Sequence, residues 1–187
     1  EPRRAGALRG LRALPRPRLS PVLVWYLATA VAGVWAVFDS PALDYRFVMV
    51  GAVLPVTEVV LGRPGPMHSL VTAVAVLAVV MLATRGRRIL RRQLLGVPIG
   101  LLAHLVFSGT WADTDAFWWP LNGLELSDAR PPELARGGLS LVLELAGIGL
   151  ALWWMRRVGL DEPASRVAFR RTGRLPRAGT PPVQGTC

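Results

Sequence analysis

The chain has 187 residues, of which 52% are hydrophobic and only 18% are charged. This composition is too apolar for an ordinary soluble domain and indicates an integral membrane protein. The formal net charge of +10 comes from arginine alone, and the arginines lie mainly in two tails and one loop, so we interpret them as markers of membrane topology and expect membrane lipids, not nucleic acid, as partners.

The N-terminal region, residues 1–20, carries six arginines against the single acid Glu1. Pro15 and Pro17 oppose a continuous helix, so we expect a basic, flexible tail. The first apolar stretch, residues 21–38, is longer than the hydrophobic region of a signal peptide and is not followed by a clean small-residue cleavage site. We therefore predict an uncleaved first membrane span.

The second apolar segment, residues 47–61, has about 15 residues, which at about 1.5 Å per residue is short for a hydrocarbon core of about 30 Å. It contains Pro55 and Glu58, and we predict a short tilted helix or a re-entrant one. If every segment crosses, the N-terminal tail and the arginine loop 85–92 lie on opposite faces. If this segment returns, both tails and the loop are cytoplasmic, and we favour that arrangement because it satisfies the positive-inside rule.

Three longer spans are predicted at residues 67–84, 94–111 and 138–155, with a polar, tryptophan-rich interfacial stretch at 112–132. The last region, residues 156–187, is rich in arginine, proline and glycine, and we expect it to be a disordered basic tail. The predicted fold is an all-α, polytopic bundle over residues 21–155 with four full spans plus one short or re-entrant helix. We expect a multi-pass protein of the cell membrane with both tails in the cytoplasm.

His104 is the first candidate for a functional residue, because a histidine inside a membrane-length apolar run is costly unless it has a partner or a use. Helical spacing of i, i+4, i+7 and i+11 predicts that Ser108, Trp111 and Asp115 share its face. A second histidine, His68, opens the neighbouring span. Histidines together with an acid suit a divalent metal such as Zn or Mn.

Each of these residues also has an ordinary structural explanation. His104 could form an interhelical hydrogen bond, with Glu58 or Glu144 as partner. His68 could be a half-exposed histidine at the membrane interface. Glu58 could bond to backbone groups freed by Pro55, and acids such as Asp115 are commonly solvated in loops.

Four short segments occur in an order that resembles the YdjM-like family of membrane-bound metal-dependent hydrolases. They are Leu54-Pro55-Val56-Thr57-Glu58, Met67-His68-Ser69-Leu70, His104-Leu105-Val106-Phe107-Ser108 and Trp118-Trp119-Pro120. The resemblance covers about residues 51–121.

The resemblance implies that His68 and His104 are metal ligands and that Glu58 stands at the family's second acidic position. Ser69 matches the serine that follows the first histidine. Val56 and Ser108 occupy positions where the family has aspartate, and neither can supply a carboxylate. Asp115, about two turns beyond Ser108, is our own candidate for a compensating metal ligand.

Two functions remain open. In the first, His68, His104, Glu58 and Asp115 hold the metal, Glu58 is also catalytic, and a metal-bound water hydrolyses a lipid-linked or membrane-delivered ester. In the second, the chain is a non-catalytic member with a degenerate metal site, acting as a membrane partner subunit or a lipid-binding protein. The sequence has no Gly-rich phosphate loop, no HExxH, no Gly-x-Ser-x-Gly and no CxxC, and its lone Cys187 cannot form an intrachain disulfide.

Overall fold

The computed structural model describes residues 22–40, 43–60, 65–123 and 139–176. Within these ranges the chain is helical and has no β-strand, so the predicted all-α class is confirmed. The elements in chain order are α1 (Leu23–Phe38), α2 (Tyr45–Val60), η1 (Pro66–His68), α3 (Leu70–Ala83), α4 (Arg88–Leu94), α5 (Gly96–Ser108), η2 (Thr110–Ala112), α6 (Thr114–Phe117), α8 (Leu139–Arg157) and α9 (Pro163–Thr172).

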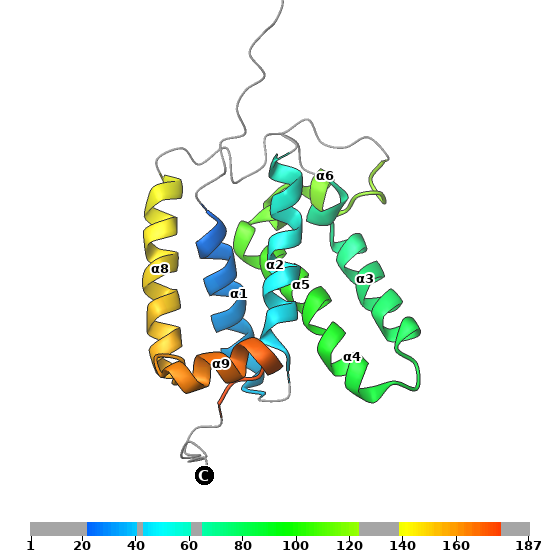
Figure 1. The fold of residues 1–187 in the computed structure, drawn as a ribbon. Helices are drawn as coiled ribbons and strands as arrows, with labels where there is room; N and C mark the ends of the chain where they lie inside the picture. The colour runs from blue at the N-terminus through cyan, green and yellow to red at the C-terminus, as the bar shows by residue number, and fades with distance from the viewer. Residues whose placement is uncertain (1–21, 41–42, 61–64, 124–138, 177–187) are drawn as a thin grey trace, which may run out of the picture.

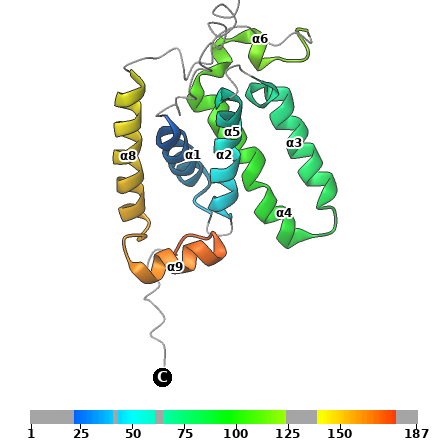
Figure 2. The ribbon, with the colours of Figure 1, turned by 45° about the horizontal axis from the view of Figure 1, so that its top comes forward.

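The long helices run up and down between two ends of a bundle (Figures 1 and 2). We call the end that carries η1, η2 and α6 the histidine end. The opposite end, with the turn before α4, the end of α8 and the whole of α9, is the arginine end. Helix α1 runs from the histidine end to the arginine end, α2 returns, α3 descends, α4 and α5 ascend together, and α8 descends again.

Helix α2 is a short crossing helix and not a re-entrant one. It is continuous over 16 residues with Pro55 inside it, and it runs from the arginine end to the histidine end (Figure 1). This course through the bundle does not support the re-entrant arrangement that we favoured. The start of α1 and the end of α8 lie at opposite ends of the bundle, which does not support placing both tails on one side of a membrane. The N-terminal tail itself, residues 1–20, lies outside the described residues.

Among the described residues, two helical stretches, Arg88–Ser108 and Leu139–Arg157, are long and apolar enough to span a membrane, where the sequence predicted four full spans. Helices Leu23–Phe38 and Leu70–Ala83 are apolar but shorter. The first ends where Asp39 adopts a left-handed conformation, with φ of 37°, and the second begins only after the 3-10 turn η1. The predicted span 67–84 was too long because it included the last residues of η1.

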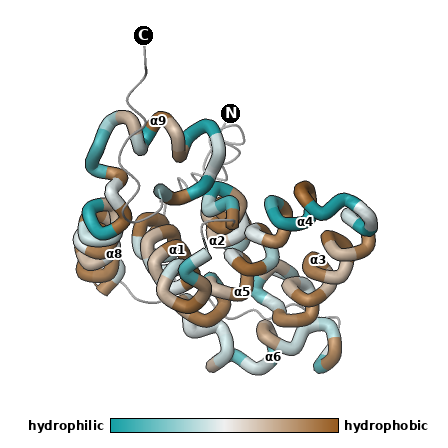
Figure 3. Tube along the Cα trace, turned by 90° about the horizontal axis from the view of Figure 1, so that it is seen from below, coloured by the Kyte–Doolittle hydropathy of each residue, from teal (hydrophilic) through white to brown (hydrophobic). Residues whose placement is uncertain are grey.

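The outward faces of α3 and α8 are apolar. Figure 3 shows both helices mainly in the hydrophobic colour, whereas the hydrophilic colour gathers on α9 and α4. The exposed apolar side chains are Val74, Val79, Met81 and Leu82 on α3, and Leu139, Leu141, Val142, Leu145, Ile148, Leu152 and Trp153 on α8. Exposed apolar surface of this extent marks an interaction with a membrane or another apolar partner.

Helices α2 and α5 approach each other at backbone distance, because glycines lie at their crossing. A Cβ atom on Gly51 would lie 2.0 Å from the carbonyl oxygen of Val97, and one on Gly100 would lie 2.1 Å from that of Val48. Small residues that allow backbones to touch are typical of helix pairs in membranes. This crossing sets the position of His104 on α5 relative to α2.

Helices α1 and α8 are joined through Glu144. Its carboxylate accepts hydrogen bonds from the backbone N–H of Val24, at 3.1 and 3.2 Å, and of Trp25, at 3.3 Å. These N–H groups belong to the first turn of α1, where helices lack internal acceptors. Gly147, one turn further, lets α8 lie against the backbone of Trp25.

Helix α9 forms within residues 156–187, where a disordered tail was expected. It packs across the arginine end, with Phe169 and Leu175 against the core cluster that contains Tyr45 and Trp154. Composition alone did not predict this helix, because the apolar residues that make its contacts are few and widely spaced. Residues 177–187 lie outside the described residues.

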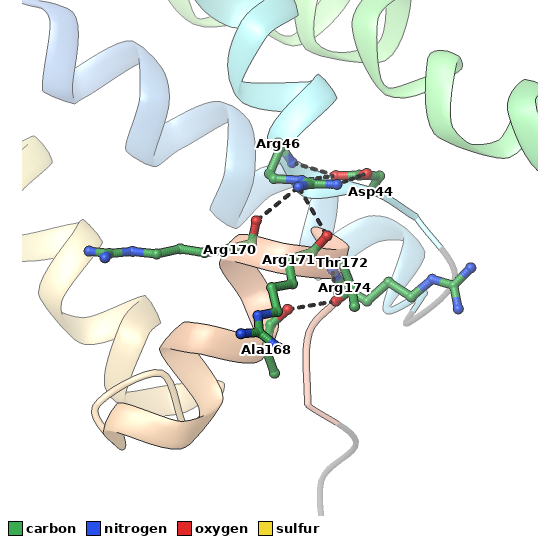
Figure 4. Close-up of polar contacts among 7 residues, drawn as sticks. All are labelled: Asp44, Arg46, Ala168, Arg170, Arg171, Thr172 and Arg174. Atoms are coloured by element: carbon green, nitrogen blue, oxygen red, sulfur yellow. Dashed lines mark hydrogen bonds and ion pairs between the residues drawn. The ribbon is translucent and has the colours of Figure 1, made fainter.

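The C-terminal end of α9 is held by Arg46 (Figure 4). Its guanidinium donates to both carboxylate oxygens of the buried Asp44, at 3.1 and 2.9 Å, and to the backbone carbonyls of Arg170, at 2.9 Å, and Arg171, at 3.3 Å. A cation is well placed there, because the last carbonyls of a helix carry partial negative charge. Gly173 follows with φ of 67°, the left-handed conformation that commonly ends a helix.

Candidate functional site

Glu58, His68 and His104 meet at the histidine end, although they come from α2, η1 and α5. The Nδ1 atom of His68 lies 3.0 Å from Oε2 of Glu58, and the two imidazole rings are edge to face with centroids 5.6 Å apart. Both histidines are fully buried, and Glu58 is 9% exposed. The half-exposed, interfacial alternative for His68 is therefore wrong.

Glu58 accepts hydrogen bonds on both carboxylate oxygens. The backbone N–H of Gly65 donates to Oε2 at 3.0 Å, and that of Met67 donates to Oε1 at 2.9 Å. A carboxylate engaged only as an acceptor requires that His68 carry its proton on Nδ1 and donate it to Glu58. The lone pair of a neutral His68 is then on Nε2. Carboxylate–histidine pairs of this kind orient the imidazole in metal sites.

His104 is oriented in the same way by the backbone of α2. Its Nδ1 lies 2.8 Å from the carbonyl oxygen of Ala52, and a carbonyl only accepts, so Nδ1 carries the proton. Pro55 lies nearby in α2, and a proline inside a helix lacks an N–H and disturbs the carbonyls of the preceding turn. The predicted interhelical hydrogen bond of His104 exists, but its partner is Ala52 and not Glu58 or Glu144.

The aromatic ring of Tyr26 on α1 packs against the imidazole of His104, with ring centroids 4.3 Å apart. Tyr26 is buried, and nothing in the sequence distinguished it from the other apolar residues of the first span. The Ala52 carbonyl could not be predicted as a partner of His104 either, because every residue has a backbone carbonyl and the residue type does not show which one accepts. The nearest indication was Pro55, three residues further along the same helix.

Ser69 connects the histidine pair to the tryptophan-rich segment. Its hydroxyl donates to the backbone carbonyl of Trp119 and accepts from the backbone N–H of Val71 at 3.1 Å. The second bond makes Ser69 the N-cap of α3, which fixes the start of the helix directly after His68. The segments quoted for the resemblance thus meet at one end of the bundle.

Ser108 lies one turn after His104 and is fully buried. Its hydroxyl pairs with that of Thr110 at 2.6 Å and lies 3.3 Å from the carbonyl of Leu105. The position that is acidic in the resembling family is therefore a hydroxyl here, within a small polar cluster. Val56, at the other such position, is partly buried in α2.

Asp115 is not in line with His104. Helix α5 ends at Ser108 because Gly109 adopts a left-handed conformation with φ of 74°, and the chain then forms η2 and the short helix α6. The stripe of i, i+4, i+7 and i+11 assumed one uninterrupted helix and breaks at this glycine. Asp115 is exposed on α6, whereas His104 is buried, so the spacing argument that joined them is wrong.

The donor set does not fit a complete three-ligand metal centre. Catalytic zinc sites have three protein ligands and an open position. Across the described ranges, no group of three or more His, Cys, Asp or Glu side chains is arranged to hold a metal ion. Glu125 and Asp128, acids of the interfacial stretch, lie outside the residues that the structure describes.

Comparison of the chain with protein-family models, curated proteins and solved structures finds no match.

Proposed function

We propose that this chain is an integral membrane protein in which His68 and His104 hold a divalent metal ion, Zn or Mn, and that it hydrolyses a lipid-linked or membrane-delivered ester. The observation that carries the proposal is the anchoring of both buried imidazoles through Nδ1, to Glu58 at 3.0 Å and to the Ala52 carbonyl at 2.8 Å. This fixes on both rings the tautomer whose Nε2 can bind a metal. When bound, such a metal acidifies a water molecule and polarises a carbonyl or phosphoryl oxygen.

In this proposal Glu58 is a positioning residue, which changes the role expected from the sequence. Both of its oxygens are engaged by backbone N–H groups and by His68, so it is poorly placed as a metal ligand or a general base. What the chain supplies is a fixed, buried pair of imidazoles. Burial keeps bulk water away from them and strengthens their electrostatic interactions with any bound cation.

A membrane location is supported by two helical stretches of sufficient length and apolar character and by the apolar outward faces of α3 and α8. The histidine end would then lie near one membrane surface, with the indole-rich segment around Trp118 and Trp119 beside it, as is common at membrane interfaces. A substrate delivered by the membrane suits a site buried among helices.

The proposal is tested by metal analysis of the purified protein beside a His68→Gln, His104→Gln double variant. Glutamine is close to histidine in size and polar, which limits the packing loss. We expect about one Zn or Mn per wild-type chain and a large loss in the double variant. Glu144→Gln, a change of a carboxylate at the α1–α8 contact, is the control and should keep the metal. Equal, substoichiometric metal in all three proteins would sink the proposal.

The second candidate is a non-catalytic member of the same scaffold, acting as a membrane partner subunit or a lipid-binding protein. It is favoured by the hydroxyl of Ser108, which pairs with Thr110 where the resembling family has an acid. A wild-type protein that contains no bound metal and hydrolyses no ester, but that folds with Glu58, His68 and His104 buried, would support this candidate.

A further inference from the structure

A crevice opens at the arginine end of the bundle, far from the histidine pair. It has a volume of about 310 Å³ and lies between the C-terminal end of α1 with the linker to α2 on one side and α4 and α5 on the other. Its lining residues are Phe38, Ser40, Leu43, Arg92, Leu95 and Ile99. Among them Arg92 is the one charged side chain, and apart from Ser40 the others are apolar.

The charged and apolar parts of this lining are arranged in sequence along one helix face. Arg92, Leu95 and Ile99 are spaced i, i+3 and i+7, so they form one stripe over α4 and α5. Arg92 is exposed, whereas Leu95 and Ile99 are partly buried. The stripe therefore begins with a guanidinium in solvent and continues over about 10 Å with apolar side chains. An amphiphile with an anionic head and an apolar chain matches this order.

The surroundings of the crevice are strongly basic. The exposed arginines at this end are Arg85, Arg87, Arg88, Arg92, Arg156, Arg157, Arg166, Arg170, Arg171 and Arg174. The exposed acids near them are Asp39, Asp161 and Glu162. Helix α9 lies across this end (Figures 1 and 3) and carries the exposed Arg166, Arg170 and Arg171. Such a surface attracts anionic lipid headgroups.

We propose that the crevice is a binding site for an anionic phospholipid, with the phosphate on Arg92 and one acyl chain along Leu95 and Ile99. A guanidinium pairs well with a phosphate because its N–H groups match two phosphate oxygens. A soluble phosphate would use the arginine and leave the apolar wall uncovered, and a zwitterionic lipid would bring a second cation next to Arg92. The site does not depend on metal binding at the histidine end.

The test measures lipid retention by the full-length protein in detergent, by native mass spectrometry after addition of phosphatidylglycerol, phosphatidylcholine or inorganic phosphate alone. We expect wild type to retain phosphatidylglycerol and to retain phosphatidylcholine at least about tenfold less. Arg92→Gln should lower phosphatidylglycerol affinity about tenfold or more, because a charged hydrogen bond to the phosphate is lost.

Arg85→Gln is the matched control, since it removes the same charge from the same end of the bundle, and Arg85 does not line the crevice. It loses only longer-range attraction, so its effect should stay within about fivefold. Ser40→Trp tests the chain-binding wall, because it fills the crevice and leaves all charges in place. We expect it to reduce retention as Arg92→Gln does, in protein that elutes as wild type on gel filtration.

The proposal is overturned if wild type retains the two lipids equally, if Arg92→Gln and Arg85→Gln have the same effect, or if inorganic phosphate alone competes as strongly as phosphatidylglycerol. Unchanged retention in Ser40→Trp would likewise reject the crevice as the chain site.

Discussion

Glu58 accepts hydrogen bonds from two backbone N–H groups and from His68. Because both carboxylate oxygens are engaged, we expect Glu58 to position His68 and not to act as a catalytic base. Replacement by glutamine keeps the size of the side chain but removes one acceptor and the charge that holds His68. We expect Glu58→Gln to weaken Zn or Mn binding about 10- to 100-fold, the usual effect of losing the partner of a metal-ligating histidine.

The measurement is a metal titration of purified protein, with Glu144→Gln as the control for loss of a carboxylate elsewhere. Metal affinity equal to wild type together with abolished hydrolysis would show that Glu58 is a catalytic base and not a positioning residue.

Ser108 offers a gain-of-function prediction at the same scale. It is buried one turn from His104, and an aspartate there would place a carboxylate where the resembling family has one. We expect Ser108→Asp to raise metal affinity by about tenfold or more, equivalent to about 1.4 kcal/mol. Ser108→Asn has nearly the same shape without the charge, and a titration in which both variants behave alike would contradict the prediction.

The sequence identified Glu58, His68 and His104 because their order matched a known motif arrangement, and the structure brings them together. It failed for Asp115, because a spacing argument assumes a continuous helix and Gly109 ends α5 first. The partners of His104 could not be predicted. One is a backbone carbonyl, and the other, Tyr26, lies in a span where most residues look equally apolar.

At the scale of elements, the contact of α2 with α5 decides the geometry of the site, because it fixes His104 against Ala52. A methyl group on Gly100 would lie 2.1 Å from the carbonyl oxygen of Val48, which is too close, so the helices must move apart. We expect Gly100→Ala to destabilise the protein by about 1–3 kcal/mol and to weaken metal binding.

Gly149→Ala is the matched control, since a Cβ there meets nothing within 4 Å. It should be neutral or slightly stabilising, because alanine favours a helix over glycine by about 0.5–1 kcal/mol. Thermal unfolding in detergent compares the two variants, and equal unfolding temperatures would show that the glycine crossing has no special role.

Helix α9 shows why a prediction of disorder from composition can fail for a single element. An arginine-rich segment with proline and glycine resembles a disordered tail, yet the carbonyls at its C-terminal end accept hydrogen bonds from Arg46, more than 120 residues away in the chain. Its docking therefore depends on a long-range partner. Gly173 is part of that docking, because any side chain there would collide with the carboxylate of Asp44.

For the whole molecule, the directions of the helices predict which residues lie on the same side of a membrane. By the positive-inside rule, we expect the arginine end to face the cytoplasm. Helix α6 lies at the opposite end of the bundle. On a Cys187→Ser background, single substitutions Arg88→Cys and Arg171→Cys should react with a membrane-impermeant thiol reagent only from the cytoplasmic side. Asp115→Cys should react only from the outside.

Labelling of Arg88→Cys and Asp115→Cys from the same side would contradict the crossing of the bundle. The all-α class and the approximate positions of the helices were predictable from the positions and lengths of the apolar stretches. The direction of α2 was not, because the positive-inside rule favoured a re-entrant arrangement of this short segment.

Helices α4 and α5 carry both Arg92 and His104, separated along their length by about 18 Å. In a bilayer that distance places the two residues in different leaflets. A lipid held at Arg92 would belong to the cytoplasmic leaflet, whereas the buried histidines would meet molecules from the outer one. Only esters that already reside in the outer leaflet, or that are flipped to it by other proteins, would then reach the histidine pair, so access would depend on lipid asymmetry.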